Sequence, residues 1–391
     1  MSNQQGRTIG ELGEFSLIAQ MAARMRPGPG TVIGIGDDAA VLAAPDGRVV
    51  ATTDFLLEGR HFRRDWSGPV DIGHRAAVRS LADVAAMGAV ATGLLVAFAA
   101  PAELPASWAL GVAEGLAAES ARAGAPVAGG DVARFGAVLL AVTGLGDLQG
   151  RSPVTRSGAR PGDVVAVAGP LGHSAAGLAL LEAGLAAPPA ASADPAPPDL
   201  PAELARLVRA HLRPAPPYDA GPEAAALGAT AMIDVSDGLL ADLGHIAGAS
   251  GVAIDVRSAA LDTTALAPAA RALGARALGA RAPGATALSW ALTGGEDHSL
   301  AATFPPGVPL PPRWAVIGTV HEAQGVHEGQ GVHEGQGVHE GQGVHEAQGV
   351  HEGQGVHEAQ GVHETQGVPA GYGVLVDGRP HAGPPGWDHF R

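Results

Sequence analysis

The amino-acid sequence predicts an α/β (α+β) protein with two domains, and three observations support this. The chain has 391 residues, enough for two ordinary domains with a large core. Apolar residues make up 46% of it and charged residues 16%, which is typical of a globular chain. Strand-like and helix-like segments alternate along it, as they do in domains that pack helices on sheets.

The first part of the chain contains four short β-type runs, at residues 39–45, 48–57, 91–101 and 137–148. Between them lie two segments with apolar residues at helical spacing and glycine near their ends, at residues 71–89 and 105–124. A turn-rich stretch at 149–163 follows. We therefore expect an N-terminal domain at residues 1–150 and a C-terminal domain at 151–391.

The second part continues with a strand, a glycine turn and a helix at residues 164–184, then a strand-to-helix pattern at 231–256. We interpret the glycine turn "GPLGHSAAG" as a tight turn into a packed helix, because it lacks the full G-x-G-x-x-G spacing of a dinucleotide site. Three segments are predicted to be loop insertions: 186–203, 262–285 and a hexapeptide repeat at 320–367.

The hexapeptide V-H-E-[GA]-Q-G, with one Thr variant, occurs eight times in tandem. Its regularly spaced histidines raise the hypothesis of a metal-sequestering protein without catalytic activity. One apolar residue per repeat is too few to bury a core, so we favour a solvated loop. The repeat lies between β-type runs at 314–320 and 372–378, and we expect it to extend a hairpin loop between them.

Several functions are excluded by residues that the chain lacks. It has no cysteine, which excludes disulfides, thiolate metal sites and a cysteine nucleophile. It has no lysine either, which excludes a P-loop lysine and Schiff-base chemistry. A net charge of −15 argues against a nucleic-acid partner. With no membrane-span run and no signal-peptide pattern, we expect no membrane partner and a cytoplasmic location.

Acidic residues gather at the ends of the predicted elements, beside glycine and other small residues. Examples are "GIGDD", "TTDF", "GGD", "DVSD" and "GGED", with Asp83 inside an otherwise apolar helix. Singly, each acid could be a helix cap or a turn residue. As a set they could serve glycoside hydrolysis or a calcium site, but aromatics are only 4% and the acids are dispersed. Dispersed carboxylates favour several Mg²⁺ ions held between protein and substrate phosphates.

These stretches, together with "GEFSLIAQM", "LLEGRHF", "TRSGARPGD" and the terminal "GWDHF", resemble the thiamine-monophosphate kinase family. The matches keep the family's order and cover nearly all of the chain outside the three insertions. The superfamily, which also holds aminoimidazole ribonucleotide synthetase and selenophosphate synthetase, implies an N-terminal domain that pairs with its copy in a homodimer and an active site between the domains. Aminoimidazole ribonucleotide synthetase lacks this combination of motifs, and selenophosphate synthetase relies on cysteine or selenocysteine, which this chain lacks.

The resemblance implies transfer of the γ-phosphoryl group of ATP to the phosphate of thiamine monophosphate. It implies several Mg²⁺ ligands, namely Asp38, Thr52, Thr53, Asp54, Asp83, Asp131, Asp234 and Asp237. Nucleotide contacts would come from Gly130, Asp131, Arg156 and Ser236, and substrate contacts from His61, Glu296 and Trp387. One departure is that "GGED" continues with His298 and Ser299, where the family usually has Tyr and Glu, which makes the contribution of Asp297 uncertain.

This reaction suits the composition of the chain. The acceptor phosphate is already ionised near neutral pH, so we expect no residue to act as general base. Phosphoryl transfer depends mainly on positioning and electrostatic stabilisation. Metal ions would supply the charge that lysine provides elsewhere, Arg156 could add a bidentate contact, and Glu296 and Trp387 suit a cationic ring.

Overall fold

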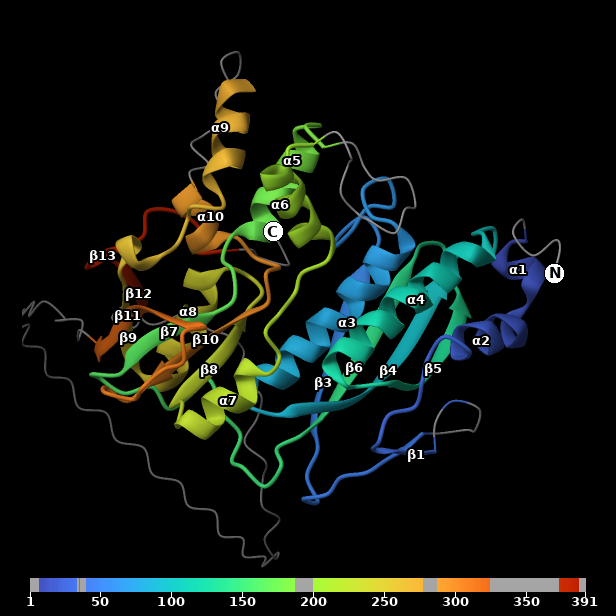
Figure 1. The fold of residues 1–391 in the computed structure, drawn as a ribbon, viewed down its shortest axis with the longest axis horizontal. Helices are drawn as coiled ribbons and strands as arrows, with labels where there is room; N and C mark the ends of the chain where they lie inside the picture. Colours follow the sequence, from blue (N-terminus) through green and yellow to red (C-terminus); the bar gives the residue numbers. More distant parts are fainter. Residues whose placement is uncertain are drawn as a thin grey trace, which may run out of the picture.

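The computed structural model describes residues 7–33, 35, 40–186, 200–276, 287–323 and 373–386. Its described part contains two main sheets, and helix α3 (Pro69–Ala86) lies between them (Figure 1). Most of α3 packs on the N-terminal sheet, whereas its last residues, Ala85 and Ala86, join Met232 and Leu300 in a core cluster of the C-terminal sheet. Residues of α3 are therefore in reach of both halves of the chain.

The N-terminal sheet has four strands in the order β3-β6-β4-β5, with β4 and β5 parallel and the other pairs antiparallel. The strands are β3 (Val50–Leu57), β4 (Val90–Ala100), β5 (Val127–Arg134) and β6 (Leu139–Asp147). Helices α3 and α4 (Ala106–Ala123) cover one face, burying Leu94, Phe98 and Leu140. No described element covers the opposite face, where Phe55 is 56% exposed.

Glycines let α3 and α4 approach closely. A Cβ at Gly73 would lie 2.0 Å from the carbonyl oxygen of Val112, and one at Gly115 would lie 2.0 Å from that of Val70. Since non-bonded atoms cannot approach so closely, side chains are excluded at both positions. The start of α3 is fixed by Asp71, whose Oδ2 accepts a hydrogen bond from Gly68 N at 2.9 Å.

Shorter elements precede this sheet. Helices α1 (Ile9–Leu12) and α2 (Glu14–Ala22) pack against α4, and strands β1 (Thr31–Ile33) and β2 (Val41–Leu42) form a separate antiparallel pair. Thr8 caps α1 through a capping box with Glu11.

The C-terminal sheet has seven strands in the order β13-β12-β9-β11-β7-β10-β8. All its pairs are antiparallel except β12 with β9. The strands are β7 (Val164–Ala168), β8 (Ala231–Val235), β9 (Val252–Val256), β10 (Ser299–Phe304), β11 (Trp314–Glu322), β12 (Gly373–Val376) and β13 (Arg379–Pro380). Its inner strands are apolar almost throughout, because both faces are covered.

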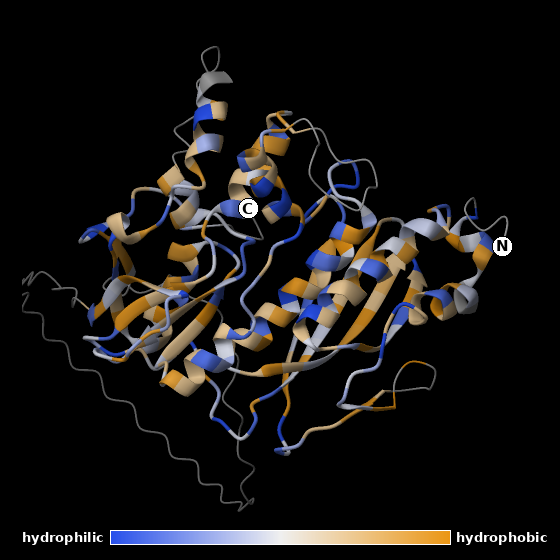
Figure 2. Ribbon diagram, in the orientation of Figure 1, coloured by the Kyte–Doolittle hydropathy of each residue, from blue (hydrophilic) through white to orange (hydrophobic). Residues whose placement is uncertain are grey.

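One face of this sheet packs against most of the C-terminal helices, and the other face packs against α7 (Ala220–Leu227) and the end of α3. The first group comprises α5 (His173–Glu182), α6 (Ala202–Leu212), α8 (Leu239–Ser250), α9 (Ala267–Arg276) and α10 (Ala287–Thr293), and a 3-10 turn, η1 (Ser258–Ala260), follows β9. In Figure 2 hydrophobic residues are frequent along the strands of both sheets and alternate with hydrophilic ones along the helices. None of the described helices is long and apolar enough to cross a bilayer.

Four details differ from the sequence-based expectations. Strands β11 and β12 lie on opposite sides of β9, so they do not form the hairpin that the sequence predicted. The pairing of strands that are distant in the sequence is not encoded in the local pattern. Helix α9 occupies part of the predicted loop 262–285, and the first three residues of the repeat, 320–322, belong to β11. The glycine pair before Asp131 lies inside β5 and does not end it.

Candidate functional site

Two predicted ligands from motifs far apart in the sequence meet where β3 lies against α3. Thr52 Oγ1 donates a hydrogen bond to Asp83 Oδ2 at 2.6 Å. One turn before Asp83 on α3, Ser80 Oγ donates to Asp54 Oδ2 at 3.1 Å, and Arg79 Nε lies 3.9 Å from Asp54 Oδ1. The alternation of β3 turns Thr52 and Asp54 toward the helix, which brings both to the same side of the sheet.

The C-terminal sheet contributes Asp234, the fourth residue of β8, which is 4% exposed. Burial, and then the negative charges of Asp234 and Asp54, raise the pKa of Asp83 to about 7. This shift means that the three carboxylates repel one another. Cations among them would relieve that repulsion.

His298, which stands where the family usually has tyrosine, lies beside this cluster. Its Nδ1 is 3.1 Å from Asp234 Oδ2, and its side chain is buried. Burial alone would lower the pKa of His298, but the hydrogen bond to Asp234 and the charges of Glu296 and Asp234 raise it above its usual value. The neighbouring carboxylates therefore favour the protonated form of His298.

Asp242, on the first turn of α8, is a further buried acid that sequence analysis did not single out. Its Oδ2 accepts hydrogen bonds from Asp237 N at 3.1 Å and Gly238 N at 3.0 Å, which holds the "DVSDG" turn. Burial, and then the charges of Asp234 and Asp237, raise its pKa to about 8. The available signal for this role in the sequence was the position of Asp242 in the first turn of the helix that follows the "DVSDG" turn.

Glu296 and Asp297 are neighbours with different surroundings. Arg75 Nη2 donates to Glu296 Oε2 at 2.8 Å and Arg79 Nη1 donates to Glu296 Oε1 at 2.5 Å, so two residues of α3 bind a carboxylate of the other sheet's domain. Burial would raise the pKa of Glu296, but the charges of Arg79 and Arg75 hold it well below its usual value. The Glu296 side chain is thus an anion under ordinary conditions.

Asp297 caps helix α5. It accepts hydrogen bonds from Gly172 N at 2.5 Å and Ser174 N at 2.8 Å, and its side chain is buried. The structure thus gives Asp297 a role although His298 and Ser299 replace the usual Tyr and Glu: its hydrogen bonds join the "GGED" loop to the "GPLGHS" turn. Ser299 adds to this contact by donating from Oγ to Pro170 O.

A cavity of about 440 Å³ opens where these elements meet. Its lining includes predicted metal and nucleotide residues from both halves of the chain, namely Thr52, Asp83, Arg156 and Asp234. Its volume lies within the range of about 300–1,000 Å³ that is usual for small-molecule sites. Among the described residues no three acidic or histidine side chains converge closely enough to hold a metal ion alone. That arrangement fits Mg²⁺, which takes one or two carboxylates and completes its shell with phosphate oxygens and water.

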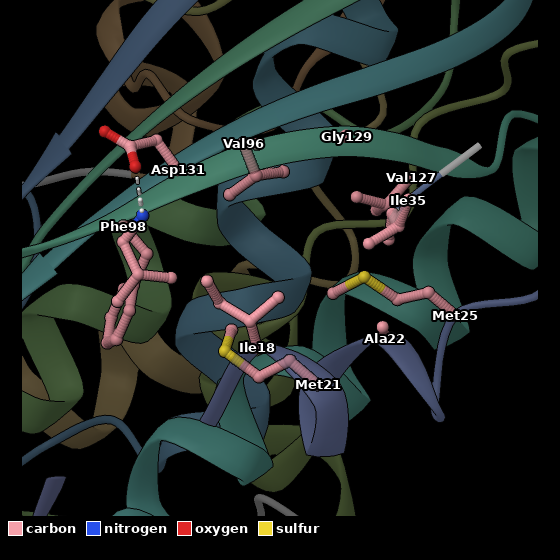
Figure 3. A pocket seen from close by; sticks show the side chains of 12 residues that line it. Ile18, Met21, Ala22, Met25, Ile35, Val96, Phe98, Val127, Gly129 and Asp131 are labelled. Atoms are coloured by element: carbon pink, nitrogen blue, oxygen red, sulfur yellow. Dashed lines mark hydrogen bonds between the residues drawn. The ribbon is translucent and has the colours of Figure 1, made fainter. Parts of the chain in front are cut away.

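Other predicted residues lie elsewhere. Gly130 and Asp131 are on β5, at the opposite edge of the sheet from β3, and they line a mostly apolar pocket of about 60 Å³, too small for a nucleotide (Figure 3). Asp131 Oδ1 accepts a hydrogen bond from Val132 N at 2.9 Å. The structure does not bring Asp131 to Asp54 within one chain.

The remaining predicted residues have other hydrogen-bond partners or lie outside the described residues. Thr53 is turned to the open face of the sheet, where its Oγ1 donates to Val142 O at 3.2 Å. His61 Nδ1 accepts a hydrogen bond from Leu57 N at 3.0 Å, which places the proton of a neutral ring on Nε2. The carbonyl oxygen of Ser236 accepts from Glu296 N at 2.8 Å. Asp38 and Trp387 lie outside the described residues.

Comparison with known proteins places this geometry in a family. Residues 36–148 match the family model described as AIR synthase related protein, N-terminal domain. A thiamine-monophosphate kinase of Mycobacterium tuberculosis is 47% identical over 320 residues, which cover 80% of this chain and 86% of that protein.

Solved structures of thiamine-monophosphate kinases are also similar to this chain. The crystal structure of thiamine-monophosphate kinase from Stenotrophomonas maltophilia K279a aligns with a TM-score of 0.66 at 30% identity, covering 93% of this chain and 96% of that one. AaThiL complexed with AMPPCP and TMP aligns with a TM-score of 0.65 at 27% identity, covering 97% and 98%. The α/β fold predicted from the sequence is thus confirmed, and the chain belongs to the thiamine-monophosphate kinase family.

Proposed function

We propose that this chain transfers the γ-phosphoryl group of ATP to the phosphate of thiamine monophosphate, which yields thiamine diphosphate and ADP. The observation that carries the proposal is the cavity between the two sheets, where Arg156 and the acids Asp83 and Asp234 line one space. A nucleotide in this cavity would lie against an arginine and beside two carboxylates that repel each other.

The carboxylate cluster is the proposed metal site. Asp54, Asp83 and Asp234 would hold Mg²⁺, with Thr52 orienting Asp83 through its hydrogen bond. The bound ions would reduce the repulsion between the triphosphate of ATP and the phosphate of thiamine monophosphate and align the two groups. The same role is proposed for the other residues of the set implied by the resemblance, Asp38, Thr53, Asp131 and Asp237.

The chain's own side chains position the reactants. Arg156 can form a bidentate contact with a phosphate of ATP, and the backbone at Ser236 is proposed to contact the nucleotide, with Gly130 of the partner subunit as a further contact. His61 Nε2–H can donate to the acceptor phosphate. Glu296 and Trp387 are proposed to contact the substrate ring. No residue need remove a proton, because the attacking oxygen belongs to an ionised phosphate.

A coupled assay of ADP release tests the proposal. With Mg·ATP, thiamine monophosphate should support turnover, and free thiamine at the same concentration should support little. Omitting Mg²⁺ should abolish the reaction. Faster turnover with free thiamine would overturn the substrate assignment, and ADP release without an acceptor would point to an ATPase.

We also propose a homodimer that covers the open face of the N-terminal sheet. Phe55 and Phe135, both 56% exposed, lie on β3 and just after β5, and Ala97 of β4 is exposed between those two strands. Exposed apolar side chains of this kind on a sheet mark an interaction surface. The register places Asp131 in line with Ala97, Ala141 and Phe55, so its side chain shares this face.

A dimer through this face explains how Asp131 could serve the metal site. Within one chain, β5 and β3 are three strand spacings apart, roughly 14 Å, and Asp131 and Asp54 point to opposite faces. Asp131 of the partner subunit would therefore complete the site. Mixing Asp131→Asn with Asp54→Asn chains should restore about a quarter of the normal turnover, since half of the dimers would keep one intact site. No recovery in a freely exchanging mixture would place both residues in the same subunit's site.

The cytoplasmic location and the division at residue 150 stay predictions from the sequence.

A further inference from the structure

Helix α3 carries four charged residues spaced four apart: Asp71, Arg75, Arg79 and Asp83. This spacing places them on one face of the helix. That face is turned to the C-terminal half of the chain, where Arg213 Nε donates to Asp71 Oδ1 at 2.5 Å and Glu296 accepts from both Arg75 and Arg79. The two arginines thus meet a single carboxylate from the other sheet's domain.

This carboxylate does not satisfy the two guanidinium groups. Arg75 is only 2% exposed, yet its Nε and Nη1 have no hydrogen-bond partner among the described residues. The buried Nε of Arg79 also lacks one, because Asp54 at 3.9 Å is beyond hydrogen-bond distance. Buried cationic donors without partners are rare and require an explanation. A bound anion with more oxygens than a carboxylate would be one.

The nearby groups add no second anion at hydrogen-bond distance. His211 interacts electrostatically with Arg75, and burial followed by the charge of Arg75 lowers its pKa to about 3. His211 is therefore neutral at ordinary pH, and its Nδ1 lies 3.1 Å from Ser174 Oγ. Two positive charges consequently face one directly bonded negative charge.

Glu296 lies on the accessible side of the arginines. Its side chain is 27% exposed, against 2% for Arg75 and 10% for Arg79. It follows the glycine pair Gly294–Gly295 and has a left-handed backbone, with φ of 66°. An anion that approaches the guanidinium groups from the solvent side would meet Glu296 first.

We propose that Arg75 and Arg79 bind the phosphate group of the substrate, and that Glu296 occupies this anion site only while the substrate is absent. The incoming phosphate would displace the carboxylate, and the released Glu296 would pair with the positively charged thiazolium ring of the same molecule. This inference rests on the proposed function and adds to it the residues that distinguish a thiamine phosphate from free thiamine.

Ion-pair exchange explains the selectivity in physical terms. A phosphate carries about two negative charges near neutral pH and presents three acceptor oxygens, so it can use the donors that Glu296 leaves unpaired. Free thiamine brings only the cation. To pair with it, Glu296 would have to leave two buried arginines without a hydrogen-bonded counter-ion, which is strongly unfavourable.

Equilibrium binding measured without ATP tests the proposal on Arg75→Gln, Arg79→Gln and Glu296→Gln. Arg213→Gln is the matched control, because it breaks the other ion pair of the same helix face. In the unsubstituted protein, thiamine monophosphate should bind more tightly than thiamine. This preference should fall at least tenfold in Arg75→Gln and Arg79→Gln and persist in Arg213→Gln. Arg79→Lys, which keeps the charge, should recover part of it.

Glu296→Gln gives the sharpest result. Removal of the competing carboxylate should increase the affinity for inorganic phosphate, whereas a merely structural contact between domains predicts no increase. The proposal is overturned if Glu296→Gln binds phosphate no better, or if the arginine variants weaken thiamine and thiamine monophosphate equally. If the unsubstituted protein turns over no thiamine monophosphate, the proposed function fails, but phosphate binding by Glu296→Gln still tests the anion site.

Discussion

Thr52 and Asp83, which are 31 residues apart in the sequence, are joined by a hydrogen bond of 2.6 Å between Oγ1 and Oδ2. This contact fixes a strand residue and a helix residue at the rim of the cavity between the two sheets. Asp83 is consequently held beside Asp54 and Asp234, which repel it when it is ionised. Ionised Asp83 therefore lowers the stability of the fold, whereas the proposed metal site needs its negative charge.

We expect Asp83→Asn to stabilise the fold and remove activity. The pKa of Asp83 is raised to about 7, so the ionised carboxylate destabilises the native state at pH 8, and asparagine lacks that charge. Without Mg²⁺ the free energy of unfolding at pH 8 should rise by roughly 1 kcal/mol or more. Turnover should fall by about a hundredfold or more, as when other charge-stabilising groups are removed.

Urea unfolding and the ADP-release assay measure these two effects. Asp219→Asn is a suitable control, because Asp219 is exposed and its side chain pairs with the surface arginine Arg313. It should change both quantities little. Near-normal turnover in Asp83→Asn would remove Asp83 from the metal site.

The environment of Glu119 predicts how the free energy of unfolding changes as the pH is lowered. This buried residue of α4 accepts hydrogen bonds from Tyr218 and Arg122 and pairs with His74. Burial would raise its pKa, but the hydrogen bonds from His74 and Arg122 lower it from 4.5 to about 2. Its stabilisation is therefore complete above pH 4.5 and is lost as the pH falls toward 2. The shift corresponds to about 3 kcal/mol.

The measurement compares unfolding free energies of the unsubstituted protein and Glu119→Gln between pH 6 and pH 3. The difference should be largest at pH 6 and should shrink steadily below pH 4.5. A difference independent of pH would show that Glu119 stabilises the fold without its charge.

The close contact of α3 and α4 predicts opposite effects of two glycine substitutions. Gly115→Ala places a Cβ 2.0 Å from Val70 O and should destabilise the protein by about 1–3 kcal/mol or more. Gly244→Ala in α8 meets no atom within 4 Å and should stabilise it by roughly 0.5–1 kcal/mol. Thermal unfolding compares the two, and equal melting temperatures would contradict the observed helix contact.

Deletion of residues 326–363 should leave turnover unchanged. The ends of the connection lie close together, since Glu322 pairs with Val252 and Gly373 with the next residue, Ala253, on either side of β9. Two strand spacings amount to roughly 10 Å, which the remaining residues 323–325 and 364–372 can span easily. Loss of turnover in a shortened chain with an unchanged melting temperature would assign the repeat a function.

Local patterns were sufficient to predict several elements that carry the site. The helical spacing of 71–89 and the apolar run of 48–57 correspond to α3 and β3, and the "DVSD" motif does lie between a strand and a helix, β8 and α8. These features depend on residues near one another in the chain, so the sequence expresses them directly.

Features that depend on distant residues were missed. Nothing local indicates that β5 lies three strands from β3, or that β9 separates β11 from β12. The sequence presented Glu296 as a contact for the cationic ring of the substrate, and it did not indicate that Arg75 and Arg79 bind the same carboxylate in the structure. The four-residue spacing of charges on α3 was the available signal, and its partners are visible only in the folded chain.

The most direct test of the proposed metal-assisted transfer is an anomalous difference map from a crystal that contains Mn²⁺ in place of Mg²⁺, a non-hydrolysable ATP analogue and thiamine monophosphate. Peaks at coordination distance, about 2–2.3 Å, from Asp54, Asp83 or Asp234 and from phosphate oxygens are expected. Phosphates bound in the cavity with no peak among these carboxylates would contradict the mechanism.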